Sequence, residues 1–248
     1  MKPIVLALAL AVMLPPAAQA GPGRHLCNIS SQSQYSIRLT PQALLFFRDG
    51  GIPSTVEMRR GELTVDGKQL DLSDADHRRI AEYEATIRAL VPQVKAIARD
   101  AADIAYTAVG EVANSFAGDG SALRAKLERM HAEVRARIDA SFDSKPWNEK
   151  EFGNVVESAV TELVPALVGE LVGVAVKAAL AGDEAVAADI EKRANRIEAE
   201  IEQRVETQAR QIEARVEALC PTVAKLAQLE ADLDVRLPGG GRIDLIQD

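Results

Sequence analysis

The spacing of hydrophobic residues along the chain changes near residue 73. Before it, apolar and polar residues alternate, as in Leu63–Val65 and Leu70–Leu72, which is the period of a half-buried strand. Asp66-Gly67 lies between these two runs and is typical of a two-residue hairpin turn, because both turn positions need a positive φ. We therefore predict an antiparallel sheet of three or four strands, with one apolar face covered by the rest of the chain.

From Ser73 onward, hydrophobic residues recur every three or four positions, which is the period of an amphipathic helix. Ser73 followed by Asp74 and Asp76 is typical of a helix start, because serine caps the first N–H groups and acids favour the positive end of the helix dipole. Pro92 is expected to end or kink this helix. Further helices are predicted over 121–141, 149–181 and 183–219, with a short last helix after Pro221.

The helix predicted over 183–219 has many charged residues and a narrow apolar seam. The seam mixes spacings of three and four, which favours a coiled-coil-like arm that returns along the other helices. The predicted fold is therefore α+β and mostly α, with a small β region over 21–72 and an antiparallel helical bundle over 73–237. Pro238 and the three glycines after it predict a flexible tail over 238–248.

The first 20 residues are typical of a secretory signal peptide. Lys2 supplies the positive start, and the apolar run 4–14 is too short to span a bilayer. Ala18-Gln19-Ala20 is a small-x-small sequence that predicts cleavage between Ala20 and Gly21. We therefore expect an exported protein whose mature form begins at Gly21.

Two cysteines, Cys27 and Cys220, remain after this cleavage. In an oxidising compartment an isolated pair most simply forms one disulfide, which here would close a loop of nearly the whole mature chain. In the chain-entropy model such a loop stabilises the fold by up to about 4–5 kcal/mol. The alternative is a redox-active pair, although the Cys-x-x-Cys spacing typical of such pairs is missing.

Several short motifs occur in an order that resembles a known family. They are Cys27, Thr40-Pro41-Gln42, Asp66-Gly67-Lys68-Gln69, Glu82-Tyr83-Glu84-Ala85, Arg88–Pro92 and Cys220. Together they resemble the YggN-like family of bacterial envelope proteins, whose function is unknown; the similarity is clearest over 27–145. The resemblance implies export to the periplasm of a Gram-negative bacterium and a paired Cys27 and Cys220. It brings no activity and no catalytic residue.

Composition and motifs point away from several kinds of chemistry. The net charge of -8 argues against a nucleic-acid-binding protein. His25 lies in the expected N-terminal arm, while His77 and His131 lie among charged residues on predicted helices, so each is expected to be exposed or merely packed. No Gly-x-Ser-x-Gly, His-Glu-x-x-His or Gly-Lys-Ser/Thr motif occurs, and the acids from Asp139 to Asp143 lack the glycine of a calcium loop. We predict no catalytic residue, no cofactor and no metal ion.

The helix predicted over 149–181 is the most apolar one in the mature chain. Glu157, Glu162 and Glu170 lie within it, and a charge near a bilayer centre costs about 2.5–3.5 kcal/mol on insertion scales. This segment is therefore interpreted as a buried helix of a protein that is not integral to a membrane, with membrane contact as the alternative.

Three functions are compatible with these patterns. The favoured one is a non-enzymatic periplasmic protein of the cell envelope whose helices bind another envelope protein or a second copy of the chain, because of the seamed helix over 183–219. The second is a lipid- or membrane-associated protein that uses the helix over 149–181. The third is an enzyme with an unrecognised acidic site, suggested by the acidic clusters alone.

Overall fold

The structure, a computed structural model, describes residues 33–116, 122–141, 143, 147, 184–237 and 240–246, with four single positions between 161 and 176. Three of the sequence predictions therefore lie outside the described residues: the signal peptide with its cleavage site at Ala20 and Gly21, the partner cysteine Cys27, and nearly all of the helix over 149–181.

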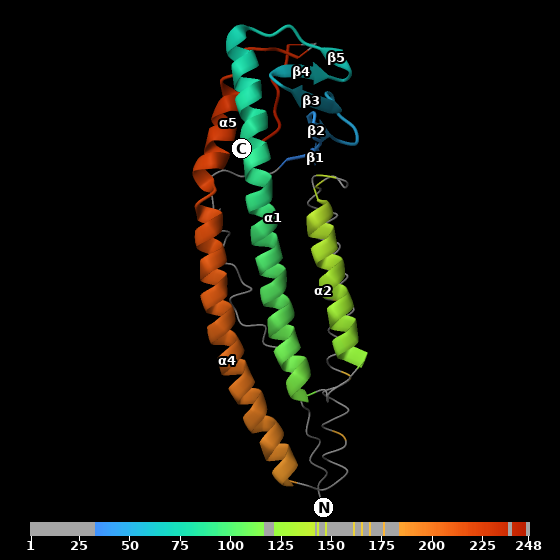
Figure 1. Ribbon diagram of the computed structural model, residues 1–248, viewed down its shortest axis with the longest axis vertical. Coiled ribbons are helices and arrows are strands. Elements are labelled where there is room, and N and C mark those ends of the chain that lie inside the picture. The colour runs from blue at the N-terminus through green and yellow to red at the C-terminus, as the bar shows by residue number, and fades with distance from the viewer. Residues whose placement is uncertain are drawn as a thin grey trace, which may run out of the picture.

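The described chain forms a five-stranded antiparallel sheet followed by long helices, which confirms the predicted α+β, mostly α fold (Figure 1). The strands are β1 (Ser36–Leu39), β2 (Leu44–Phe47), β3 (Thr55–Arg59), β4 (Glu62–Val65) and β5 (Lys68–Gln69), and they pair in chain order. The helices are α1 (Asp74–Phe116), α2 (Ala122–Ala140), α4 (Glu184–Glu217) and α5 (Cys220–Ala231). The sheet thus has more strands than the three or four predicted.

One face of the sheet packs on the first third of α1, on α5 and on the end of the chain, and we call this part the head. Its core contains side chains from all of these elements: Tyr35, Leu44, Phe46, Val56, Met58, Leu63 and Val65 from the sheet region, Ile80, Tyr83, Ile87 and Val91 from α1, and Leu226, Leu233, Ile243 and Leu245 from the C-terminal region. Leu70 and Leu72 pack against its edge. The apolar face expected on the sheet is therefore covered as predicted.

Two tight hairpin turns shape the sheet. Asp66 and Gly67 have φ values of 46° and 77°, which confirms the turn predicted from this dipeptide. Arg60 and Gly61, between β3 and β4, have φ values of 50° and 87° and form a second turn that the sequence analysis did not identify. A Cβ atom on Gly61 would lie 2.7 Å from the carbonyl oxygen of His77, so this turn needs glycine for space as well as for φ.

Helix α1 begins as predicted, with the Ser73 hydroxyl accepting a hydrogen bond from the Asp76 N–H at 3.1 Å. It continues through Pro92 to Phe116, so this proline does not end the helix, which was one of the two outcomes expected for it. A proline inside a helix removes one backbone hydrogen bond and its ring crowds the carbonyl of the preceding turn, which together cost about 3 kcal/mol. Contacts on both sides support the helix through this point: Val91 is buried in the head core, and the Lys95 ammonium is bonded to the end of α2 and to Asp143 after it.

The last residues do not extend from the fold as the flexible tail that the sequence predicted. Ile243 is 6% exposed and Leu245 is 1% exposed, and both belong to the head core. The side chain of Arg242 donates hydrogen bonds to the carbonyl oxygens of Ala231 and Leu233. The described residues that follow, 240–246, are therefore held against the head rather than free.

Below the head, α2 and α4 flank the remaining length of α1 and run antiparallel to it; we call this part the rod (Figure 1). Ion pairs join α4 to α1, between Arg215 and Asp100 and between Arg204 and Glu111. Among the α4 side chains that the structure describes, none is buried. The predicted seam is only half-buried where it is described, at Ile201, Val205, Ile212, Val216 and Leu219.

Candidate functional site

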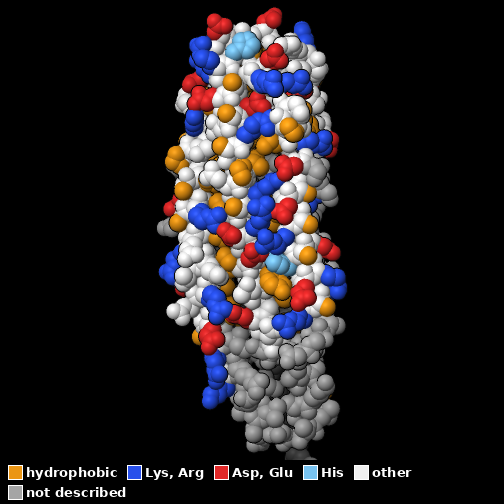
Figure 2. Space-filling model, in the orientation of Figure 1, with side chains coloured by type: hydrophobic (Ala, Val, Ile, Leu, Met, Phe, Trp, Pro, Cys, Tyr) orange, Lys and Arg blue, Asp and Glu red, His pale blue; other side chains and the backbone are white. Residues whose placement is uncertain are grey.

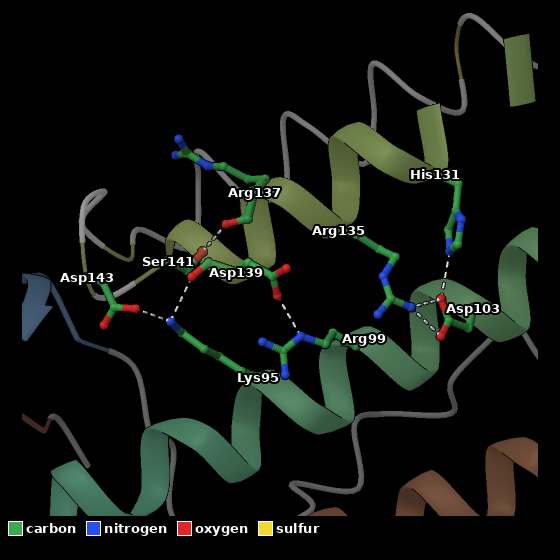
Figure 3. A network of polar contacts seen from close by, with 9 residues as sticks. All are labelled: Lys95, Arg99, Asp103, His131, Arg135, Arg137, Asp139, Ser141 and Asp143. Carbon is green, nitrogen blue, oxygen red and sulfur yellow. Dashed lines mark hydrogen bonds and ion pairs between the residues drawn. The ribbon is translucent and has the colours of Figure 1, made fainter. Parts of the chain in front are cut away.

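A ladder of polar contacts joins α1 to α2 (Figure 3). On α1, Lys95, Arg99 and Asp103 are spaced by four residues and therefore share one helix face. Three α2 residues with the same spacing, His131, Arg135 and Asp139, lie opposite them in antiparallel order. The ladder records the register in which the two helices pair.

The upper end of the ladder is centred on Lys95, which is 8% exposed. Its Nζ atom donates to the carbonyl oxygen of Asp139 at 2.9 Å and to the Asp143 carboxylate at 2.7 Å. Arg99 Nε donates to the Asp139 carboxylate at 2.6 Å. The buried ammonium is thus neutralised, and it ties the end of α2 to the middle of α1.

The lower end of the ladder is centred on Asp103. Its carboxylate oxygens accept hydrogen bonds from Arg135 at 2.7 and 2.6 Å, and Oδ1 lies 2.7 Å from His131 Nε2. The imidazole ring of His131 stacks on Tyr106 with ring centroids 4.2 Å apart. The hydrogen bond from Arg135 has the largest effect and lowers the pKa of Asp103. Burial has a smaller effect and raises this pKa, while the contact with His131 lowers it further. Asp103 therefore carries a stable negative charge that serves to pair two helices.

An open groove follows the seam between α1 and α4. Its upper hollow has a volume of about 370 Å³ and is lined by Pro92, Gln93, Ala96, Ile97, Arg215, Ala218 and Leu219. Its lower hollow, of about 290 Å³, is lined by Asp100, Asp103, Ile104, Thr107, Gln208, Gln211, Ile212 and Arg215. The upper part is mostly apolar and the lower part mixes aliphatic and polar walls. We call these two hollows the α1–α4 groove.

The surface around these features carries both signs of charge. On the face in Figure 2, acidic and basic side chains lie side by side along the helices, with apolar side chains between them. Within the described ranges, no group of three or more His, Cys, Asp and Glu side chains is placed to hold a metal ion. None of the helices, as far as they are described, is both long and apolar enough to cross a membrane.

Both histidines that the structure describes make structural contacts, although His77 is exposed. His77 Nδ1 lies 2.9 Å from the carbonyl oxygen of Gly61 and helps to hold the second hairpin turn. His131 belongs to the ladder. Cys220 begins α5, is half-buried and is not a free cysteine. Its pairing with Cys27 stays a prediction, because Cys27 lies outside the described residues.

The sequence analysis did not predict the ladder, although the spacing of charged residues in the sequence indicates it. Charged residues at intervals of four on two neighbouring helices predict a row of ion pairs once the helices are antiparallel. The sequence does not supply the register that brings Asp103 opposite Arg135, because that register depends on how both helices pack on the rest of the molecule.

Comparison with known proteins gives a family without an assigned activity. A family model described as a protein of unknown function, DUF2884, matches residues 27–246, and the chain belongs to this family. The uncharacterized protein YggN of Escherichia coli K12 is 21% identical over 145 residues, which cover 58% of this chain and 57% of that protein. The YggN proteins of the O6:H1 and O157:H7 strains match to the same extent. The chain thus spans just over half the length of these curated relatives. No solved structure matches this chain.

Proposed function

Starting from this membership of a family of unknown function, we propose that the protein is exported to the periplasm and acts there by binding another protein through its rod, rather than by catalysis. The partner element that fits best is an apolar face of a helix, seated in the α1–α4 groove. The observation that carries the proposal is that the apolar seam of α4 is only half-buried where it is described. The two hollows of the groove lie beside it, between α4 and α1.

The shape and chemistry of the groove support a helical partner. Helices commonly dock in grooves that offer an apolar floor with polar walls, using side chains at intervals of three and four. Ala96, Ala218 and Leu219 line the upper hollow, and the two alanines leave space for larger side chains from a partner. Gln208 and Gln211 supply polar walls below.

The use of the charged residues supports a role other than catalysis. The buried Lys95 and the ionised Asp103 are both engaged in joining α1 to α2. Asp76 and Glu84 are also buried, and each accepts backbone N–H groups that hold other segments in place. These four charged side chains, which could have served in acid–base catalysis, are therefore used to hold the fold together.

Export rests on the signal-like residues 1–20, and a disulfide between Cys27 and Cys220 is part of the proposal. Cys220 lies at the start of α5. Ser33, the first described residue before β1, lies six positions after Cys27, and a segment of that length reaches up to about 20 Å. We propose that Cys27 reaches the junction of α4 and α5 across this span.

Site-specific photo-crosslinking in intact cells tests this function. A photoreactive residue at Ala218, in the groove, is compared with one at Ala85, an exposed alanine on α1 in the head. We expect a discrete protein adduct from position 218 and none from position 85. We also expect Ala96→Trp, which fills the upper hollow, to suppress the adduct. Equal adducts from both positions, or none from the groove, would contradict the proposal.

The mass of the adduct separates two partners. An adduct of twice the mass of the mature chain indicates a second copy, and light scattering on the purified oxidised protein should then show a dimer. Any other mass indicates a different envelope protein, to be identified by mass spectrometry.

A further inference from the structure

The end of the chain forms a strap, described over residues 233–237 and 240–246, that crosses the head, and these residues do not pair in its sheet (Figure 1). It folds back on itself where Leu237 N–H donates to the Gly241 carbonyl oxygen at 2.8 Å and Gly240 N–H donates to that of Leu237 at 2.9 Å. Each of its two arms is held by a buried carboxylate of the head.

The first carboxylate is that of Asp76 in the first turn of α1, which is 1% exposed. It accepts the backbone N–H groups of Asp234 at 3.2 Å and Val235 at 3.1 Å. Arg79 completes the site with a hydrogen bond of 2.9 Å. The outgoing arm of the strap is thus fixed to the start of α1.

The second carboxylate is that of Glu230 near the end of α5, which is 8% exposed. Its Oε1 atom accepts the N–H groups of Leu245 at 2.5 Å and Ile246 at 3.4 Å. These contacts hold the returning arm where Ile243 and Leu245 enter the head core. Two ionisable groups therefore hold a segment that covers part of that core.

We propose that the strap is an acid-sensitive latch, which opens when Asp76 and Glu230 take up protons while the rest of the head stays folded. An ionised carboxylate is a stronger acceptor for backbone N–H groups than a neutral carboxyl group. The sheet and α1 are held mainly by backbone pairing and apolar burial, which do not titrate, while the carboxylates of Asp66 and Glu84 bond two of the sheet's loops. Acid therefore weakens the attachment of the strap selectively.

Charged and titratable groups lie around both carboxylates, and those around Asp76 lower its pKa. Asp76 faces Arg79 on its own helix and Asp234 on the strap, with Asp232 beyond Arg79. Burial alone would raise the pKa of Asp76, but the Asp234 N–H and Arg79 more than offset this and lower it. Glu230 lies near Tyr83 of α1 and near Tyr35 of the sheet region, which also interacts with Arg48, Asp66 and Asp244.

The lowered pKa of Asp76 fixes the sign of the pH dependence. Its contribution to stability is fully present above the ordinary carboxyl pKa and is lost as the pH falls through the folded value. The Asp76 contact therefore holds in mild acid, and it is released only when the pH falls below the ordinary pKa of a carboxyl group. Opening the strap withdraws Ile243 and Leu245 from the head core and so uncovers other apolar side chains of that core.

Hydrogen exchange of the full mature chain, followed by mass spectrometry over a pH series and corrected for intrinsic exchange rates, tests the latch. Peptides from the strap are compared with peptides from residues 74–91 of α1 in the same samples. In acid we expect strap protection to fall at least about tenfold while α1 protection stays unchanged. Strap and α1 losing protection together, or a strap that stays protected as far as acid unfolding, would overturn the proposal.

Two variants and a control sharpen the test at neutral pH. Asp76→Asn and Glu230→Gln mimic the protonated carboxyl groups and should each reduce strap protection about tenfold, with α1 protection kept. Asp244→Asn removes an exposed acid from the strap itself and should change nothing. If either variant fails to fold, the pH series on the unaltered chain still decides. Strap protection that is the same in all three variants would also overturn the latch.

Discussion

The head and the rod share one helix, α1, yet they bury their side chains very differently. In the head, Leu44, Val56 and Leu63 are fully buried, and the core joins strands, helices and the chain end. In the described rod, α2 buries Leu123, Leu127 and Ile138 on its side, while α4 buries no described side chain. The head therefore holds the fold together, and the rod keeps a surface that a partner can cover.

The difference follows from the chemistry of the two interfaces. Aromatic and large aliphatic residues fill the head, including Tyr35, Phe46 and Tyr83, whose rings meet edge to face. The α1–α4 side of the rod relies on small residues, half-buried aliphatic residues and ion pairs such as that of Arg215 with Asp100. Exposed ion pairs contribute only about 0–1 kcal/mol each. A binding surface on the rod thus costs little of the total stability.

The largest expected effect comes from removing a side chain of the head core. Leu63→Ala should lower the free energy of unfolding by about 3–4 kcal/mol, because it leaves a cavity where the side chain was fully buried. Ile212→Ala, at the half-buried α4 seam, is the matched control and should cost about 1 kcal/mol. Urea unfolding followed by circular dichroism measures both. Equal losses would remove the distinction between head and rod.

Breaking the proposed disulfide tests whether the head is tied to the junction of α4 and α5. Cys27→Ser and Cys220→Ser should each lower stability by about 3 kcal/mol, because the unfolded chain regains the freedom of a long loop. Thermal unfolding with and without reductant provides the check on the unaltered chain. Equal melting temperatures under both conditions would show that no stabilising bridge exists.

Substituting two glycines of the sheet by alanine distinguishes the cost of a steric clash from the cost of backbone strain. Gly61→Ala should cost about 2–3 kcal/mol, since the new Cβ would meet the His77 carbonyl oxygen at 2.7 Å and φ is 87°. Gly67→Ala has a similar φ of 77° but meets nothing within 4 Å, so it should cost about 1 kcal/mol. The difference measures how closely the second hairpin turn packs on α1. A cost at Gly61 no greater than that at Gly67 would argue against this contact.

The smallest effect is expected in the ladder of the rod. Asp103→Asn should cost at most about 1 kcal/mol, because the pair with Arg135 is partly exposed, and the cost should shrink in high salt. The lowered pKa of Asp103 means that its contribution is present above the ordinary carboxyl pKa and is lost as the pH falls through the folded value. Comparing the variant with the unaltered chain at neutral and acid pH checks both points. A larger loss in high salt would contradict a surface ion pair.

The sequence predicted those features that depend on local residues. Asp66-Gly67 determines its turn, and Ser73 with the following acids starts α1. The Arg60-Gly61 turn was missed because arginine rarely takes a positive φ; Glu84, which accepts the Arg60 N–H at 2.8 Å, helps hold this turn against α1. This contact joins residues that are far apart in the chain. The spacing of hydrophobic residues therefore cannot predict it.

The same reasoning explains why two local signals did not decide the structure. Pro92 favours a helix end locally, but packing of Val91 in the head and the contacts of Lys95 carry α1 past it. Pro238 and its glycines favour a flexible tail locally, but Asp76 and Glu230 hold the segments on either side. The candidate site depends on distant contacts in the same way, because the groove exists only once α4 lies against α1.

Native-state hydrogen exchange in low concentrations of denaturant tests the division into head and rod most directly. We predict that amides of β2, β3, β4 and residues 74–91 exchange only through global unfolding, while those of residues 201–217 in α4 exchange through a lower-energy opening that leaves the head folded. The same opening free energy in both regions would contradict a tightly packed head joined to a more loosely packed rod, the part that we propose binds a partner.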